Sequence, residues 1–409
     1  MENMNNLQKC SLCGQVYHEN IIFKANNIFI SAENLQEKPS MHLHNYARGG
    51  GGSIKLSQCD KCGYIENLAF NKNEMQKMYS SAGYYQTKNF TSRLNKHIIE
   101  IKNTIMKYAK NTDIFLEIAP GRGDLALALS REVSFIYTID PSKSSSNYDK
   151  TKNMKHIQGF FSKKFLDEQV DNKINFIVFR HLLEHIDNPK IFLKDIVEYL
   201  DENGMIYLEV PNAHDILRYK RFIDIYHDHC GYYQEATLVN IMNHLGCKLI
   251  EKVKYFDEQH IGLFFLKKQI RKYQEPFVFY NNIKDSFDIE IKYINDVLSR
   301  YKNIGIYGAG VQGHTLINHL NYKNLLKIVC AFEINRDKVG KYMVNSNILI
   351  NYPDRKSLEK LDCLIMAIPS HEVYAYENEI LDFIRKKYFQ GDVIRTAKGI
   401  ECFKFSKGK

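Results

Sequence analysis

Tryptophan is absent from this 409-residue chain, and proline is sparse at 8 residues. No apolar run approaches the roughly 18 to 20 residues that a membrane-spanning helix needs, since the longest stretches are as short as Leu364 to Pro369. The amino-terminal segment also lacks the apolar core and the small-residue cleavage site of an export signal. We therefore expect a cytoplasmic protein with no membrane partner.

The chain also lacks a dense cluster of charge of one sign. Its 56 basic and 47 acidic residues are scattered and leave a net charge of +9, which suits an anionic small substrate. No arginine-rich arm or aromatic-basic stripe points to a nucleic-acid partner, and we expect none. With 44% hydrophobic and 25% charged residues, the composition excludes a disordered or collagen-like chain.

The nine cysteines are an odd number, and five of them lie singly among apolar residues, which argues against a disulfide framework. The other four form two Cys-x-x-Cys pairs, Cys10 with Cys13 and Cys59 with Cys62. This spacing lets two thiolates close around one tetrahedral ion, and four soft ligands favour zinc. The alternative is two unrelated pairs of buried or redox-active thiols, but neither pair opens a helix after a strand. We expect one closed, structural zinc site.

The pattern of apolar and polar residues changes twice along the sequence, which predicts three domains. Residues 1–80 are loop-rich and hold the cysteine pairs, so we expect a small zinc-binding module. Residues 81–272 and residues 273–409 both alternate apolar strands with amphipathic helices, as in a doubly wound parallel sheet. The predicted fold is α/β, with a Rossmann-like middle domain and a second Rossmann-like domain that binds substrate. Buried strands are expected over residues 113–119, 134–140, 176–179, 205–210, 303–307, 327–332, 348–350 and 363–368.

A glycine-rich turn follows the first expected strand of the middle domain and runs Glu117-Ile-Ala-Pro-Gly121-Arg-Gly123. Glycine lets a ligand approach the backbone closely. Glu117 and Asp140 end neighbouring strands, where a carboxylate can order the turn or accept hydrogen bonds from a ribose diol. This is the layout of a class I S-adenosylmethionine site. A dinucleotide site and a plain packing turn stay open, because Gly121, Gly123 and Ala126 also have the dinucleotide spacing.

A second glycine-rich turn opens the last domain. Gly308, Gly310 and Gly313 follow the strand expected over residues 303–307, and Glu333 closes the next strand about 20 residues after the last of these glycines, as in a dinucleotide fingerprint. The following residues offer no recognisable proton donor or hydride-acceptor pocket. We expect these four residues to bind the nucleotide part of a substrate or to serve packing, with NAD binding as the alternative.

The segment Phe179-Arg-His-Leu-Leu-Glu-His185 carries a resemblance to known proteins. It resembles the three-domain S-adenosylmethionine-dependent methyltransferases that include the sugar C-methyltransferases of deoxysugar biosynthesis. The likeness covers almost the whole chain, and the combination of its pieces is specific. Those pieces are the four-cysteine module, the segment Met78 to Tyr85, the glycine turn at Glu117, the Glu184-His185 element, the stretch Ile225 to His229 and the carboxy-terminal domain.

The resemblance implies a nucleotide-linked keto-deoxy sugar as acceptor, since the family's keto group acidifies the neighbouring carbon. A base removes the proton and the enolate takes the methyl group. On this chain the resemblance makes His229 the base, and an imidazole that titrates near neutral pH suits that role. The other implied catalytic residues are Tyr226, His227, Asp228, His185 and one of Tyr84 and Tyr85. The implied donor-binding residues are Glu117, Ala119, Gly121, Gly123, Asp140, Arg180 and His181.

The sequence departs from the family pattern at three places. Asp228 stands where the family has glutamate, Gln312 replaces the lysine of the carboxy-terminal glycine turn, and Ala367 to His371 replace a turn that contains tryptophan. The resemblance therefore implies methyl transfer and leaves the acceptor open. An O-methyltransferase with the same base, an NAD-binding oxidoreductase of activated sugars and a non-catalytic scaffold protein stay as alternatives. His244, His260 and His314 lack such context, and we expect them to be structural or exposed.

Overall fold

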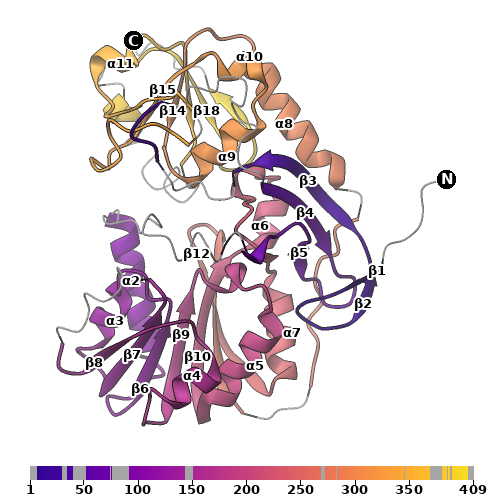
Figure 1. The fold of residues 1–409 in the computed structure, drawn as a ribbon, viewed down its shortest axis with the longest axis vertical. Helices are drawn as coiled ribbons and strands as arrows, with labels where there is room; N and C mark the ends of the chain where they lie inside the picture. The colour runs from indigo at the N-terminus through magenta and orange to yellow at the C-terminus, as the bar shows by residue number, and fades with distance from the viewer. Residues whose placement is uncertain are drawn as a thin grey trace.

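The computed structural model shows three bodies of structure (Figure 1). A seven-stranded sheet lies at the bottom of the view, a six-stranded sheet at the top, and the strands of the amino-terminal part beside them. In the described part of the chain, no helix is both long and apolar enough to cross a membrane. The structure describes residues 7–29, 35–39, 52–73, 75, 92–142, 151–268, 272–281, 283–344, 346–368, 380–384, 386 and 389–403.

The amino-terminal part folds as short antiparallel strands, joined by one strand from the middle of the chain. These are β1 (Leu7–Lys9), β2 (Val16–His18), β3 (Ile21–Ile28), β4 (Gly52–Gln58), β5 (Ile65–Asn67) and β11 (Gly231–Tyr232). The larger sheet has the order β11-β5-β4-β3. β4 alternates buried Ile54 and Leu56 with half-buried Ser53 and Lys55, as a strand with one face on a core does. β11 lies inside the predicted middle domain, yet it completes the sheet of the amino-terminal one.

The seven-stranded sheet is the largest element. Its strands are β6 (Ile114–Ile118), β7 (Phe135–Asp140), β8 (Met154–Gln158), β9 (Ile174–Arg180), β10 (Leu200–Pro211), β12 (Cys247–Tyr255) and β13 (His260–Lys267). The order is β12-β13-β10-β9-β6-β7-β8, parallel from β10 to β8, with β13 antiparallel to both of its neighbours. The chain reverses its direction across the sheet between β6 and β9. Ligands of such sheets bind outside the carboxyl ends of the strands at this point.

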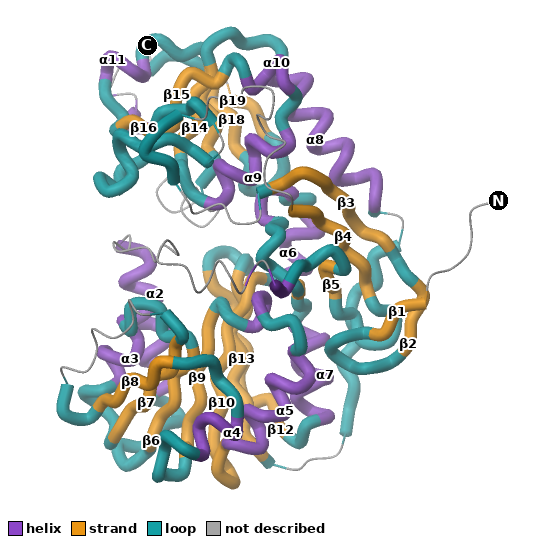
Figure 2. Tube along the Cα trace, viewed as in Figure 1, coloured by secondary structure: helices purple, strands orange, loops and turns teal. Residues whose placement is uncertain are grey.

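Helices cover both faces of this sheet (Figure 2). They are α2 (Ser92–Ile105), α3 (Asp124–Leu129), α4 (Lys163–Asp167), α5 (Pro189–Tyr199) and α7 (Glu235–His244). α2 and α3 share one apolar cluster with Phe115 and Phe176, whereas α4, α5 and α7 share another with Leu116 and Ile177. The sheet is therefore buried on both sides, which explains the nearly continuous apolar run of β9. Short helical segments α6 (Ala213–Arg218), η3 (Leu183–His185) and η4 (Phe222–Asp224) lie in the connections.

The carboxy-terminal domain is built on the six-stranded sheet. Its elements are α8 (Lys284–Leu298), β14 (Ile304–Tyr307), α9 (Val311–His319), α10 (Tyr322–Leu325), β15 (Ile328–Phe332), β16 (Ile350–Asn351), α11 (Arg355–Leu358), β17 (Cys363–Met366), β18 (Asp392–Arg395) and β19 (Glu401–Phe403). The order is β16-β15-β14-β17-β18-β19, and only β19 among these is antiparallel to its neighbour. The chain reverses between β14 and β17, where α9 begins.

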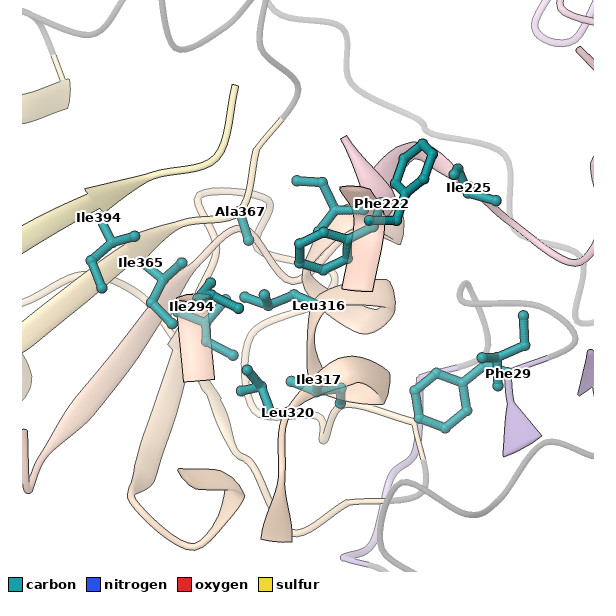
Figure 3. Packing of buried hydrophobic residues seen from close by; sticks show 14 of the residues in the cluster. Phe29, Phe222, Ile225, Ile294, Leu316, Ile317, Leu320, Ile365, Ala367 and Ile394 are labelled. Carbon is teal, nitrogen blue, oxygen red and sulfur yellow. The ribbon is translucent and has the colours of Figure 1, made fainter. Parts of the chain in front are cut away.

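One apolar core joins all three parts of the molecule. Phe23 of β3 packs against Phe287 of α8, with 5.0 Å between ring centroids. Phe222, from the connection after β10, lies edge-on against His319 at the end of α9. Figure 3 shows Phe29, Phe222 and residues of the carboxy-terminal domain in this cluster. The core therefore fixes the positions of the parts relative to one another.

The predicted α/β fold with a Rossmann-like middle domain and a second carboxy-terminal sheet is confirmed. The expected buried strands match β6, β7, β9, β10 and β14 to β17. The sequence analysis did not predict β8, β12, β13, β18 or β19, and of these β12 is an edge strand that is buried only at its two ends. Such an edge strand lacks the apolar run that identifies a central parallel strand.

The glycine turn after β14 yields a first prediction. A Cβ added at Gly313 would lie 2.2 Å from the Gly308 carbonyl oxygen, whereas one added at Gly310 would meet no atom within 4 Å. We expect Gly313→Ala to lower the free energy of unfolding by about 1–3 kcal/mol, as overpacking does, and Gly310→Ala to change it little. Chemical denaturation measures both. Equal stability of the two variants would contradict the packing role of Gly313.

Candidate functional site

The four paired cysteines meet at one point of the amino-terminal part. The Sγ atoms of Cys10 and Cys62 lie 3.7 Å apart, those of Cys13 and Cys59 lie 3.9 Å apart, and all four lie within 4.8 Å of one another. A tetrahedral zinc ion with Zn–S bonds of about 2.3 Å requires sulfur separations of about 3.8 Å. The sulfur positions therefore fit one zinc ion held by four thiolates.

Each cysteine pair is closed by a glycine that the sequence analysis did not use. The Gly14 amide donates to the Cys10 carbonyl and the Gly63 amide to the Cys59 carbonyl, both at 2.9 Å. Both glycines have a φ of 78°, a left-handed conformation that other residues adopt at a cost. The two pairs thus form matching turns, and the signal for this is a glycine directly after each Cys-x-x-Cys.

The first glycine turn lies at the carboxyl end of β6, beside the point where the sheet reverses. Ala119, Gly121 and Gly123 have left-handed φ values of 54°, 57° and 74°, and a Cβ at Gly121 would meet nothing within 4 Å. Burial raises the pKa of Glu117 to about 7, although the charge of Arg180 partly offsets this. The Glu117 Oε2 atom is buried and has no hydrogen-bond partner among the described residues. The turn therefore has open space beside Gly121, and Glu117 Oε2 is available to accept a hydrogen bond from a ligand.

Asp140 ends β7, the strand that pairs with β6 in parallel register. Its Oδ1 accepts a 2.7 Å hydrogen bond from the Ser142 amide, and the Ala119 amide donates to the Ile139 carbonyl. The predicted donor-binding residues of β6 and β7 therefore share one edge of the sheet. These contacts fit a ribose-binding carboxylate beside a glycine turn.

A cavity of about 270 Å³ lies where the middle domain meets the carboxy-terminal domain. Its volume is just below the usual range for small-molecule pockets. The lining comes from the segment after β9, the connection from Arg221 to His229, the start of β13 and the first turn of α9. Among the lining residues are His181, His185, Tyr226, His229, His260 and Gln312. The cavity therefore brings together residues that lie far apart in the sequence.

His229 is the predicted base, and the structure places it in this cavity. Its ring packs edge-on against His185 and Tyr226, with centroid distances of 4.7 and 4.9 Å. Burial, followed by the neighbouring His185, lowers the pKa of His229 to about 4. Its Nδ1 atom is buried and has no hydrogen-bond partner among the described residues. At neutral pH His229 is therefore uncharged and able to accept a proton.

Asp228, next to the predicted base, faces a different histidine. Its carboxylate lies 3.9 Å from the His185 Nδ1 atom, and that same nitrogen lies 3.0 Å from the Asp228 carbonyl oxygen. Glu184 lies beside them and is buried. Burial raises the pKa of Glu184, but its contact with His181 and the charge of His185 outweigh this and lower it to about 2.

The other predicted catalytic residues, His227 and the pair Tyr84 and Tyr85, are not among the described residues that line the cavity. His227 does not line the cavity: its Nδ1 atom lies 2.8 Å from the Ser53 carbonyl oxygen, and its ring stacks on Phe70. It therefore attaches the connection to β4 of the amino-terminal sheet. Tyr84 and Tyr85 lie outside the described residues.

The sequence analysis did not find the ion-pair cluster that holds this connection. The buried guanidinium of Arg221 pairs with Asp215, and its Nε atom lies 2.6 Å from Asp224. Asp224 also accepts a 3.1 Å hydrogen bond from the Tyr226 hydroxyl and one of 3.4 Å from the Gln312 side chain. Asp224 thus links the connection to α9, and no local spacing in the sequence signals this.

A second cluster of titratable groups surrounds Glu209 at the end of β10. Glu209 Oε1 lies 2.8 Å from His97 Nε2, 3.3 Å from His181 Nε2 and 3.5 Å from His260 Nδ1. Burial lowers the pKa of His181, but the carboxylates of Glu184 and Glu209 outweigh burial and raise it to about 9. The sequence analysis treated His260 as structural or exposed and did not single out His97 or Glu209. The structure places His260 in the cavity.

Two family models match the chain. One, described as a methyltransferase domain, matches residues 90–252, and the other, described as a C-methyltransferase C-terminal domain, matches residues 265–383. The chain carries a methyltransferase domain. The sheet of this domain has the Rossmann-like order expected of a methyltransferase, and the segment that follows matches the model of a C-methyltransferase C-terminal domain.

Solved structures with a similar fold include three named methyltransferases. Magnesium protoporphyrin IX methyltransferase from Synechocystis is 11% identical with a TM-score of 0.37, covering 48% of this chain and 100% of its own. For S-adenosylmethionine-dependent methyltransferases from Aquifex aeolicus and Archaeoglobus fulgidus the identities are 15% and 16%, and both TM-scores are 0.35. They cover 48% and 42% of this chain and 98% and 94% of their own. No curated protein sequence matches this chain.

The glycine turn of the C-methyltransferase C-terminal domain is required by packing at two of its three glycines. A Cβ at Gly308, where φ is 110°, would lie 2.3 Å from the Ala367 carbonyl oxygen, and Gly313 is equally tight. Glu333 accepts a hydrogen bond from the Ile334 amide at 2.9 Å and pairs with Lys338. Only Gly310 among the three borders open space, and Val311 and Gln312, which follow it, line the cavity.

The four-cysteine geometry yields a prediction on metal content. We expect Cys59→Ser to lower the zinc content by one ion per chain and to lower the unfolding temperature, because three thiolates hold the ion less tightly and the fold loses the free energy of zinc binding. Cys402→Ser is the matched control, since Cys402 is exposed and lies outside the cluster. Metal analysis of the purified variants gives the result. Equal zinc content in Cys59→Ser and wild type would contradict the site.

Proposed function

We propose that the protein is an S-adenosylmethionine-dependent C-methyltransferase that acts on a small anionic acceptor, a nucleotide-linked keto-deoxy sugar. The observation that carries the proposal is His229, an uncharged buried imidazole that lines a cavity at the junction of the two matched domains. A neutral imidazole that lines the cavity is placed to take a proton from a bound acceptor, for example from a carbon next to a ketone.

The proposed donor site is the edge of the sheet formed by the ends of β6, β7 and β9. S-adenosylmethionine supplies an electrophilic methyl group on a sulfonium. Asp140 would bind the ribose diol, and the open turn at Gly121 would allow close approach of the ligand to the backbone. Glu117, with its uncommitted buried oxygen, would order the turn or accept a hydrogen bond.

His229 would remove the proton from the acceptor carbon, and the resulting enolate would be the nucleophile. The imidazole is uncharged at neutral pH, so its lone pair is available without prior loss of a proton. The Nδ1 atom of His185 contacts Asp228. The other ring nitrogen, Nε2, therefore points away from that contact. We assign His185 the stabilisation of the oxyanion. Tyr226, whose hydroxyl is held by Asp224, would complete this side of the site.

The C-terminal domain would recognise the acceptor. Gln312 lines the cavity through the first turn of α9 and reaches Asp224, so it lies between the acceptor space and the connection that carries His229. A side-chain amide binds hydroxyl and carbonyl groups through hydrogen bonds and carries no charge. Gln312 therefore favours recognition of a sugar group at this point rather than of a phosphate.

We also propose that the four cysteines hold a structural zinc ion. A site closed by four thiolates leaves no position for a substrate, so the ion would stabilise the fold. The amino-terminal sheet pairs with β11 and holds His227 through Ser53. The zinc ion would therefore lie outside the cavity and would stabilise the sheet to which the connection carrying His229 is attached.

An O-methyltransferase that uses His229 on a sugar hydroxyl is the second candidate, since the same base suits an alcohol. The description of the carboxy-terminal family model favours carbon. NAD-dependent oxidation has less support, because Gly308 and Gly313 have packing roles and Glu333 pairs with Lys338.

The donor site is tested by Asp140→Asn. The loss of a charged hydrogen-bond acceptor costs about 1.5–3 kcal/mol, so we expect the affinity for S-adenosylhomocysteine to fall by about 10- to 100-fold. Isothermal titration calorimetry measures it, with NAD titrated in parallel. Asp171→Asn, at an exposed loop before β9, is the control and should bind as the wild type does. Binding of NAD alone would overturn the methyltransferase proposal.

The base is tested by His229→Ala. We expect turnover of a keto-sugar nucleotide to fall by roughly 100-fold or more, with the affinity for S-adenosylhomocysteine within a few-fold of wild type. His244→Ala, at an exposed position of α7, is the control. Unchanged turnover would remove His229 from the mechanism.

The pH dependence tests the same residue. A pKa lowered to about 4 leaves His229 protonated and inactive only below that pH, so the wild-type rate should rise through about pH 4 and be level by pH 6. The titratable groups whose electrostatic effect acts on its ring are His185, Asp228, Glu184 and Asp224. A rise centred near pH 6.5 would indicate an ordinary exposed histidine as the base.

A further inference from the structure

The cluster around Glu209 is not used by the proposed proton removal, yet it borders the same cavity. Glu209 lies at the end of β10, His181 directly after β9 and His260 at the start of β13. One ligand atom from each of the three lies within 4.8 Å of the other two. Both histidines line the cavity, and Glu209 lies behind them, fully buried. Two imidazoles and one carboxylate are a common metal-binding set.

The distances in the cluster are of two kinds. His97 Nε2 lies 2.8 Å from Glu209 Oε1, which is an ordinary hydrogen bond. His181 Nε2 and His260 Nδ1 lie 3.3 and 3.5 Å from the same oxygen, which is long for a hydrogen bond to a charged group. Ligand atoms about 2.0–2.1 Å from a tetrahedral ion are separated by about 3.3–3.4 Å. The two longer distances therefore match the edges of a metal site.

The groups around these three residues resemble the outer shell of a metal site. Glu209 Oε2 accepts a 2.8 Å hydrogen bond from the Tyr207 hydroxyl, and Oε1 contacts His97, so the carboxylate is oriented from two sides. The Nδ1 atom of His181 faces Glu184 at 3.7 Å. Metal-bound histidines commonly direct their second ring nitrogen at a carboxylate.

The backbone and the charge balance give independent support. His181 has a φ of 49°, a left-handed conformation that costs energy in a residue other than glycine and that also occurs at active sites and ligand sites. Glu184 and Glu209 are both buried, and their two negative charges face His181. Buried carboxylates require compensating positive charge, which a divalent ion bound here would supply.

We propose that His181, Glu209 and His260 bind one divalent transition-metal ion of the zinc class at the wall of the cavity. Three protein ligands leave at least one coordination position open to the cavity, as in catalytic rather than structural zinc sites. The ion would act as a Lewis acid on the keto oxygen of the acceptor, while His229 takes the proton. This role rests on the proposed function, whereas the site itself does not.

Zinc stoichiometry tests the site without any acceptor. We load the full chain with zinc, remove loosely bound metal by gel filtration and measure zinc per chain. We expect two ions in wild type and in His244→Ala, the exposed-histidine control. We expect one ion in His260→Ala, one in His181→Asn and one in Cys59→Ser, because each variant loses only one of the two sites. One ion in wild type, or two in both cavity variants, would overturn the proposal.

Cobalt distinguishes the two sites in the wild-type protein, so the test holds even if a variant fails to fold. With zinc kept in the four-cysteine site, added Co²⁺ should give visible d–d absorption without the intense sulfur-to-cobalt charge-transfer bands of a thiolate site. Saturation at one cobalt per chain supports the proposal. Spectra with thiolate charge-transfer bands, or no absorption, would overturn the proposal.

Failure of the metal site and failure of the proposed function give different results. Calorimetry of the wild-type chain with S-adenosylhomocysteine reports on donor binding, because it changes none of the three ligands. Normal donor binding with no second ion would leave methyl transfer in place and remove only the metal. A second ion without donor binding would keep the site and remove the methyltransferase proposal.

Discussion

The connection from Arg221 to Tyr232 is held from both sides, and the cavity depends on this constraint. On one side His227 attaches to Ser53, and β11 completes the amino-terminal sheet. On the other side Phe222 packs in the core shared with the carboxy-terminal domain. The buried guanidinium of Arg221, paired with Asp215 and Asp224, fixes the part in between, because a buried charge without its partners would be costly. His229 is therefore positioned by elements from all three parts of the chain.

This arrangement gives each part of the molecule a role at one site. The methyltransferase domain presents the carboxyl ends of its strands, where the sheet reverses and ligands bind. The C-terminal domain closes the cavity with the first turn of α9, and the same glycine turn that resembles a dinucleotide fingerprint serves this closure. The amino-terminal sheet contributes no lining residue among those described, yet it holds the connection that does.

Electrostatics divides the histidines of the cavity into two groups. His229 is buried among other rings, and desolvation together with His185 keeps it uncharged. His181 faces two buried carboxylates, which favour a positive charge at that point. The two imidazoles therefore favour different protonation states, because His181 is partly exposed and faces two carboxylates, whereas His229 is buried among other rings.

The sequence by itself determined the features that depend on short spacings. The two Cys-x-x-Cys pairs, the glycine turns and the apolar strands were all evident, because a metal knuckle, a tight turn and a buried strand are each built from neighbouring residues. Only the tertiary structure decided which side chains share the cavity. His97, Glu209 and His260 meet because the sheet places distant strands side by side. Within the motif from Tyr226 to His229, packing turns His227 to Ser53, Asp228 to His185 and His229 to the cavity, and the order of residues carries no information on those directions.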